Sequence, residues 1–156
     1  MKTGSLRLRL WAAAAISLAV ALVVAGLGLV YLFELHVERR IKSDLEVQLN
    51  QLVAGTRFVA DRLEVQSEPS DPRFAVPLSG YYWQVEDPAT QALVRSRSLW
   101  DEVLALPDPL VADGAVHLHE LSGPNGALLI AVERTITEPD GRSFRAMVTE
   151  DHTALT

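Results

Sequence analysis

Residues 11–33 read WAAAAISLAVALVVAGLGLVYLF, a segment of 23 residues that contains no Asp, Glu, Lys or Arg. An α-helix rises about 1.5 Å per residue, so a helix of this length crosses a hydrocarbon core of roughly 30 Å. The segment therefore predicts a transmembrane helix that anchors the rest of the chain.

A cleaved secretory signal is the alternative, because a positively charged segment with Lys2, Arg7 and Arg9 precedes the apolar residues. Signal peptides have apolar regions of about 7 to 15 residues, which is shorter than this segment. The small residues Ala19–Ala21 could mark a cleavage site, but cleavage there would leave Leu22–Phe33 as an exposed apolar tail. We therefore favour an uncleaved anchor.

The basic residues near the two ends of the segment predict its orientation. Three precede it and three follow it closely, the latter diluted among carboxylates: Lys2, Arg7, Arg9, Arg39, Arg40 and Lys42. A short basic tail beside a membrane span usually stays in the cytoplasm. We expect residues 1–10 to be a cytoplasmic tail and residues 34–156 to lie outside the cytoplasm.

The charged residues are divided unevenly between these two parts. All 20 acidic residues lie at or after Glu34, whereas three of the 14 basic residues lie before it. An acidic exterior argues against nucleic-acid binding, which needs clustered Lys and Arg. It is compatible with binding of cations or cationic peptides, and equally with plain solubility. The chain has no cysteine, which excludes disulfides, cysteine-based zinc sites and thiol nucleophiles.

Residues 34–66 form the next predicted element, a long amphipathic helix. Its apolar residues recur at steps of three, four or seven: Val37, Ile41, Leu45, Leu49, Leu52, Val59 and Leu63. We favour packing of this stripe on its own domain. A homodimer through the transmembrane helix and this helix is a further expectation, because Leu45, Leu52 and Val59 are spaced by seven. Gln48 and Gly55 interrupt the second apolar series that a coiled coil requires.

After a predicted loop at residues 67–80, which contains Pro69 and Pro72, the sequence becomes typical of β-structure. The aromatic residues 81–86, the turn at Asp87–Thr90 and residues 92–96 predict a hairpin. Residues 115–121, 127–137 and 144–149 predict three further strands. Between them, Ser98 and the acidic pair Asp101 and Glu102 predict a short helix at 98–106, with Ser98 as its N-cap.

This order of elements predicts an α+β fold. An N-terminal transmembrane helix continues into the amphipathic helix, which packs on one face of a five-stranded antiparallel sheet at residues 81–151. We expect the general plan of a small PAS-like sensor domain, with residues 152–156 as a tail. About 120 residues outside the membrane suffice for one such domain and not for two.

Several segments give this plan a more specific resemblance. The anchor with its basic tail, residues 79–85 (SGYYWQV), residues 96–101 (SRSLWD) and residues 132–136 (VERTI) resemble the N-terminal sensor region of bacterial two-component sensor histidine kinases. The resemblance implies an extracytoplasmic signal-sensing region in the bacterial inner membrane, with an unknown ligand.

The same resemblance implies partners and a cofactor that lie beyond these residues. Such kinases continue into a second membrane span, a HAMP linker, a helix with the phosphoaccepting histidine and an ATP-binding domain, and they act on a response regulator. None of these parts is present in residues 1–156, so we expect a truncated input region that binds no ATP and is inactive as an enzyme alone. The alternative is a signal-anchored envelope protein that acts as an interaction module without a kinase.

Two histidines are the candidate metal ligands. His117 and His119 share one face of a predicted strand, and Glu120 follows them. They could bind a divalent metal or titrate near neutral pH. Two ligands without a third specify a site poorly, so we favour an ordinary solvated strand face.

Four other residues are candidates for a ligand pocket: Tyr82, Trp83, Arg97 and Trp100. Aromatic side chains in a small domain belong more often to the core than to a pocket, because they supply much of its buried area. Arginines could pair with an anionic ligand or with neighbouring carboxylates. No catalytic set emerges from the sequence, and Glu133 has no evident catalytic partner.

Overall fold

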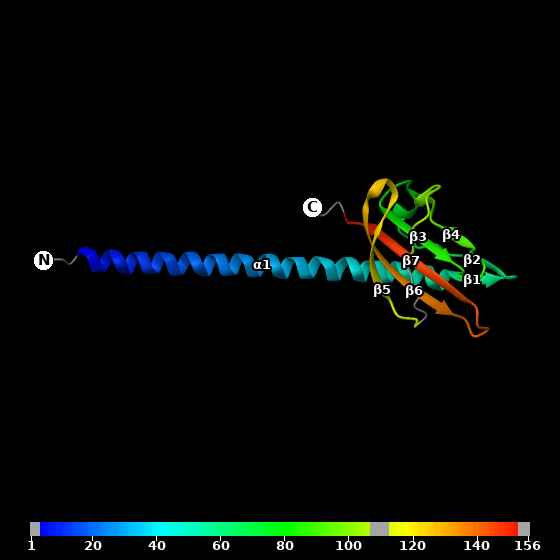
Figure 1. Ribbon diagram of the computed structural model, residues 1–156, viewed down its shortest axis with the longest axis horizontal. Helices are drawn as coiled ribbons and strands as arrows, with labels where there is room; N and C mark the ends of the chain where they lie inside the picture. Colours follow the sequence, from blue (N-terminus) through cyan, green and yellow to red (C-terminus); the bar gives the residue numbers. More distant parts are fainter. Residues whose placement is uncertain (1–3, 107–112, 153–156) are drawn as a thin grey trace. The chain divides into compact units, whose positions relative to one another are not determined.

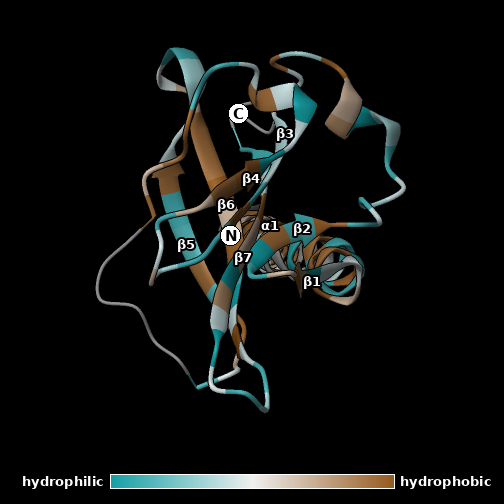
Figure 2. Ribbon diagram, turned by 90° about the vertical axis from the view of Figure 1, so that its right-hand side faces the viewer, coloured by the Kyte–Doolittle hydropathy of each residue, from teal (hydrophilic) through white to brown (hydrophobic). Residues whose placement is uncertain are grey.

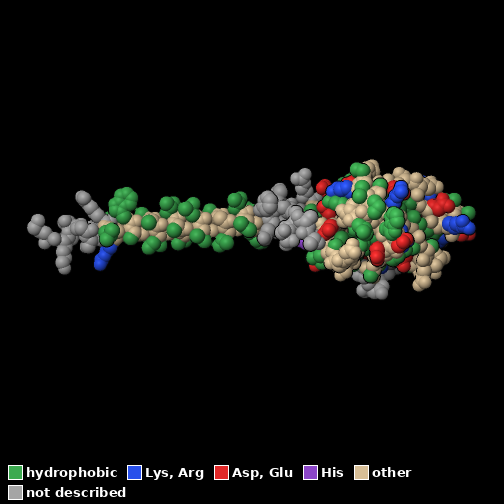
Figure 3. Space-filling view, turned by 90° about the horizontal axis from the view of Figure 1, so that it is seen from above, with side chains coloured by type: hydrophobic (Ala, Val, Ile, Leu, Met, Phe, Trp, Pro, Cys, Tyr) green, Lys and Arg blue, Asp and Glu red, His purple; other side chains and the backbone are tan. Residues whose placement is uncertain are grey.

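The computed structural model describes residues 4–106 and 113–152, and their side chains outside 4–7 and 33–40. By its internal contacts the chain divides into an N-terminal unit, Met1–Ile41, and a C-terminal unit, Lys42–Thr156. Helix α1 spans Gly4–Gly55 (Figure 1). Its residues Leu8–Leu32 form one helix segment long and apolar enough to cross a membrane, a criterion that an N-terminal signal sequence also meets. Apolar side chains cover the visible side of this segment (Figure 3).

The amphipathic helix ends at Gly55, so the prediction that it continues to residue 66 is wrong. Residues Thr56–Val59 form strand β1 and Arg62–Val65 form strand β2, which pair as an antiparallel hairpin. Ala60 and Asp61 at its tip have φ of 47° and 64°. Two positive φ angles are what the commonest two-residue hairpin turn requires. Val59 and Leu63 fitted the helical spacing, but they belong to these strands.

Gly55 makes the reversal of the chain possible. A Cβ atom at this position would lie 2.0 Å from the carbonyl oxygen of Ser67, so only glycine fits without displacing the backbone. The amide of Gln66 donates a hydrogen bond of 2.8 Å to the carbonyl oxygen of Gly55. The hairpin is thereby closed against the end of the helix.

Five further strands form an antiparallel sheet, which confirms the predicted sheet. The strands are β3 (Tyr81–Glu86), β4 (Leu93–Arg95), β5 (His117–Ser122), β6 (Leu128–Thr137) and β7 (Ser143–Asp151). Their order is β4-β3-β7-β6-β5, so the last strand of the chain lies at the centre (Figure 1). The predicted loop at 67–80 contains a 3-10 turn, η1 (Pro72–Ala75), which buries Phe74.

One face of the sheet packs against the end of α1, within the C-terminal unit. Leu45, Leu49 and Leu52 of the helix are at most 2% exposed. The guanidinium of Arg134 on β6 donates a hydrogen bond of 2.9 Å to the Asn50 side-chain oxygen. The helix therefore lies on the face of the sheet to which Arg134 belongs. Figure 2, viewed along the helix, shows the hairpin β1–β2 beside it and the apolar residues of β6 in brown.

The opposite face carries a second core. It consists of buried residues from three strands and from the segment after β4: Tyr82, Leu99, Leu104, Leu129, Ala131 and Met147. Leu99 and Leu104 hold this segment on the sheet. The segment therefore covers this core, although it does not form a regular helix.

The predicted helix at 98–106 is wrong, because only the 3-10 turn η2 (Arg97–Leu99) forms there. The Ser98 hydroxyl does not cap a helix; it donates a hydrogen bond of 2.6 Å to the carbonyl oxygen of Tyr81. Trp100 then takes a φ of 55°, outside the helical region. The amide of Leu104, which a helix would use internally, is bound by the side chain of Gln84.

Candidate functional site

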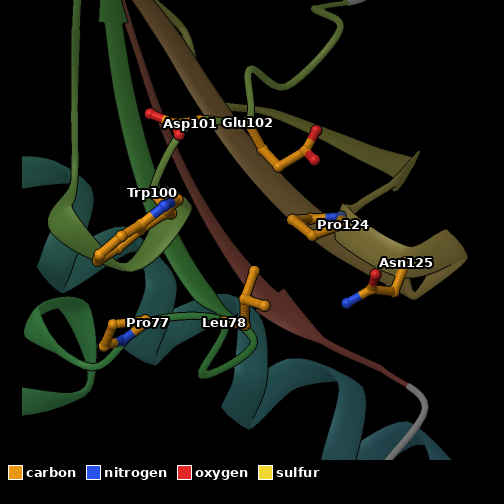
Figure 4. Close-up of a pocket in the computed structure, with 7 residues that line it drawn as sticks. All are labelled: Pro77, Leu78, Trp100, Asp101, Glu102, Pro124 and Asn125. Atoms are coloured by element: carbon orange, nitrogen blue, oxygen red, sulfur yellow. The ribbon is translucent and has the colours of Figure 1, made fainter.

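The segment that replaces the predicted helix forms one wall of a cavity of about 450 Å³. Three turns that are distant in the sequence line this pocket: Pro77 and Leu78, then Trp100, Asp101 and Glu102, then Pro124 and Asn125. In Figure 4, Trp100 and Asn125 lie on opposite sides, with Leu78 between them. The carboxylate of Glu102 extends toward Pro124. We call this cavity the Trp100 pocket.

The Trp100 wall is held in place at both ends. Leu99 before it is 0% exposed and Leu104 after it is 3% exposed. Gln84 fixes Leu104 with two hydrogen bonds, one from its side-chain amide to the Leu104 carbonyl oxygen and one from the Leu104 amide to its Oε1. The guanidinium of Arg95 donates to the carbonyl oxygens of Asp101 and Glu102 at 3.3 and 3.1 Å. The pocket is therefore formed before any ligand arrives.

Three residues that line the pocket have an unusual backbone conformation, with positive φ angles. Leu78, Trp100 and Asn125 have φ of 53°, 55° and 57°. Residues other than glycine rarely adopt such φ angles, so the surrounding structure must stabilise this backbone conformation. Part of that support is a hydrogen bond of 2.8 Å from the amide of Leu78 to the carbonyl oxygen of Ser98. One residue from each of the three turns is thus held in a constrained conformation.

The structure does not bring the four predicted pocket residues together. Tyr82 and Trp83 are 2% and 1% exposed and lie on opposite faces of β3. Arg97 is exposed in η2, and of the four only Trp100 lines the pocket described above. Burial raises the pKa of the Tyr82 phenol, and the hydrogen bond from the Gly80 amide offsets this only in part.

His117 and His119 lie on strand β5 with their rings stacked, the centroids 6.5 Å apart. Each faces a different carboxylate: His117 Nε2 lies 3.0 Å from Asp113 Oδ1, and His119 Nε2 lies 3.0 Å from Glu133 Oε1. The contact with His117 lowers the pKa of the exposed Asp113 carboxyl. Within residues 4–106 and 113–152, no three His, Cys, Asp or Glu side chains are arranged to hold a metal ion.

Sequence reasoning missed the partner of Glu133. Arg145 on β7 donates a hydrogen bond of 2.7 Å from Nε to Glu133 Oε2, and both side chains are at most 5% exposed. With His119 this makes a polar network across β5, β6 and β7, on the face opposite the helix. Arg145 pairs with Thr135 in the sheet, which places it diagonally across from Glu133. The sequence does not specify this strand register, so it could not predict the contact between Glu133 and Arg145.

A second polar cluster lies where η1 meets β3. The Arg73 guanidinium lies 3.5 Å from the centre of the Tyr81 ring and also pairs with Asp71, whose pKa it lowers. The Tyr81 hydroxyl donates to the Glu150 carboxylate. Burial, followed by this hydrogen bond, raises the pKa of Tyr81 to about 12. These residues are mutually satisfied, so we assign the cluster to the structure of the domain.

The comparisons with known proteins relate most of the chain to one curated protein. The chain is 29% identical over 142 residues to the sensor protein kinase CarS of Pseudomonas aeruginosa, an alignment that covers 90% of this chain. It spans 30% of the length of that relative. No family model matches the chain, and no solved structure matches it. The chain thus shows distant homology to a two-component sensor kinase over most of its length, which confirms the resemblance inferred from its motifs.

Proposed function

We propose that this chain is the extracytoplasmic signal-sensing input region of a membrane-bound two-component sensor histidine kinase. The observation that carries the proposal is the alignment, which covers 90% of this chain and 30% of a sensor protein kinase. A region of that extent leaves room in the relative for kinase domains. The ATP, the phosphoaccepting histidine and the response regulator of such a kinase belong to that remainder.

The proposed localisation is the bacterial inner membrane, with residues 1–10 in the cytoplasm and residues 34–156 outside it. The apolar segment Leu8–Leu32 and the short basic tail support this orientation. The acidic C-terminal unit, which pairs a helix with an antiparallel sheet, is compatible with a PAS-like sensor domain. A homodimer through α1 is a further part of the proposal.

The proposed mechanism is a shift between two packings of α1 on the sheet. Helix α1 contains both the membrane-span candidate and the buried residues Leu45, Leu49 and Leu52. A ligand that binds one packing better than the other changes their populations by its difference in affinity. Such a change would reach the kinase as a displacement of the helix.

A chimeric kinase tests this proposal. Residues 1–156 replace the aligned region of CarS, and autophosphorylation is measured in membrane vesicles with labelled ATP. Leu49 is 0% exposed and Val47 on the same helix is 52% exposed, which supplies a matched pair of variants. Leu49→Ala should change the phosphorylation rate severalfold by altering the helix packing, whereas Val47→Ala should leave it unchanged.

The alternative, an anchored interaction module without a kinase, predicts a different result. In that case the chimera would autophosphorylate at the same rate with Leu49→Ala as with Val47→Ala. Replacement of the sheet by a flexible linker would also leave this rate unchanged. Such indifference would contradict the sensing function.

A further inference from the structure

We propose that the Trp100 pocket binds an organic cation, a molecule that joins an ammonium group to an apolar body of modest size. This inference names the ligand class of the sensing region, and its biological meaning rests on the proposed function. Binding itself is a property of the C-terminal unit and is tested separately.

Apolar surface in the pocket is exposed where a folded domain would ordinarily bury it. The Trp100 side chain is 62% exposed and Leu78 is 50% exposed. Pro77 and Pro124 add rigid apolar walls. An aromatic ring open to solvent on one side of a preformed cavity binds the apolar part of a ligand and attracts a cation to its face.

The charged residues that line the pocket favour a positively charged ligand. Two carboxylates, Asp101 and Glu102, line it, and none of its seven lining residues is basic. Arg95 is not among the lining residues, and its Nη2 lies 4.0 Å from Asp101 Oδ1. No ion pair to Glu102 occurs among the residues that the structure describes. Glu102 therefore remains the carboxylate that a bound ammonium group would meet.

Asn125 supplies a directional contact opposite Trp100. Its carboxamide extends into the space between the two walls (Figure 4). The oxygen of this group can accept a hydrogen bond from an ammonium donor. A cavity of about 450 Å³ falls within the range that encloses small organic molecules, so an aromatic or branched amine fits it better than a hydrated metal ion.

The pocket requires little reorganisation on binding. The Trp100 wall is fixed by Leu99, Leu104 and the backbone contacts of Arg95, and the floor is fixed by the bond from Leu78 to Ser98. A preformed site loses less conformational entropy when it binds a ligand. The constrained backbone at Leu78, Trp100 and Asn125 is the kind that persists at binding sites.

Fluorine NMR of the full chain in lipid nanodiscs tests the binding step. The three tryptophans, labelled as 5-fluorotryptophan, report three environments: Trp11 in the membrane-span candidate, Trp83 in the core and Trp100 in the pocket. The probe is 2-phenylethylammonium, and 3-phenylpropionate is its control of similar shape and opposite charge. The Trp100 signal should shift saturably with the ammonium probe and not with the carboxylate probe.

The Trp100 signal is assigned with a Trp100→Phe variant, and Trp11 reports any partition of the probe into the bilayer. Glu102→Gln should weaken binding at least tenfold, whereas Glu64→Gln, an exposed carboxylate on β2, should leave it unchanged. A Trp100 signal unmoved by millimolar ammonium probe, or moved equally by both probes, would overturn the cation site.

The chimeric kinase separates this inference from the proposed function. A shift of Trp100 together with a changed phosphorylation rate supports both. Binding at Trp100 without any change in phosphorylation would keep the site and overturn its role as the ligand site of the sensing region. A phosphorylation response that persists in Glu102→Gln and Trp100→Phe would keep the sensing function and overturn the site.

Discussion

Arg145 on β7 donates a hydrogen bond of 2.7 Å to Glu133 on β6, and their side chains are 4% and 5% exposed. His119 on β5 lies 3.0 Å from the second oxygen of the same carboxylate. Opposite charges buried at this depth hold three strands in one register, because a shifted strand would separate them. The pair thus contributes specificity to the sheet beside the apolar core.

Glu133→Gln should destabilise the C-terminal unit strongly. The substitution removes the carboxylate that faces the buried Arg145 guanidinium, and breaking such a pair costs about 3 kcal/mol or more. Urea unfolding of the full chain in a background with Trp11→Phe and Trp100→Phe, so that only the buried Trp83 fluoresces, measures the loss. Glu64→Gln on the exposed side of β2 should change the unfolding free energy by less than about 0.5 kcal/mol. Equal stability of the two variants would refute the role given to the pair.

Gly55→Ala should also destabilise the unit, although alanine favours helices. The added Cβ would lie 2.0 Å from the Ser67 carbonyl oxygen, which must then move away. Overpacking of this kind costs on the order of 1–3 kcal/mol. Ala54→Ser, one residue earlier and exposed, is the control and should cost about 0.5 kcal/mol or less. A stabilised Gly55→Ala variant would mean that the chain does not reverse at this residue.

Ala60→Gly distinguishes the hairpin from a continued helix. Ala60 has a φ of 47°, where a Cβ atom is unfavourable, so glycine should raise the unfolding free energy by about 1 kcal/mol. In a helix that continued to residue 66 the same change would lower it by about 1 kcal/mol. The sign of the measured change therefore decides between the two structures.

The pKa of Tyr81 predicts a loss of stability at high pH. Burial and the bond to Glu150 raise the folded-state pKa of the phenol to about 12, against about 10 in an unfolded chain. The protonated phenol thus stabilises the fold fully below pH 10, and this contribution is lost as the pH rises from about 10 through about 12. Unfolding free energies measured across this range should fall less steeply for Tyr81→Phe. An unchanged slope would show that Tyr81 titrates normally.

The parts of the fold that the sequence predicted are those encoded by local pattern. The apolar segment at 11–33 and the alternating strands around Tyr82 and Val132 needed no tertiary information. The two wrong predictions, a helix to residue 66 and a helix at 98–106, lie where tertiary contacts override local preference. Gly55 admits the Ser67 carbonyl, and Gln84 takes the hydrogen bonds of Leu104.

The candidate site was predictable only in part for the same reason. The sequence singles out Trp100 as one of the aromatic residues that could line a ligand pocket, and it does line the Trp100 pocket. The residues opposite it, Pro124 and Asn125, carried only a turn signal, because nothing local indicates which turns meet in space. The register that joins Glu133 to Arg145 likewise depends on strand order, which local patterns do not specify.

The central claim, that the C-terminal unit is a sensing region outside the cytoplasm, is tested most directly by cysteine labelling. The native chain has no cysteine, so single Ser5→Cys and Glu64→Cys variants give unambiguous signals. We predict that a membrane-impermeant maleimide labels Glu64→Cys in intact spheroplasts, in the membrane fraction, and labels Ser5→Cys only after permeabilisation. Labelling of Ser5→Cys with protection of Glu64→Cys would contradict the account, as would recovery of labelled Glu64→Cys as a shortened soluble protein.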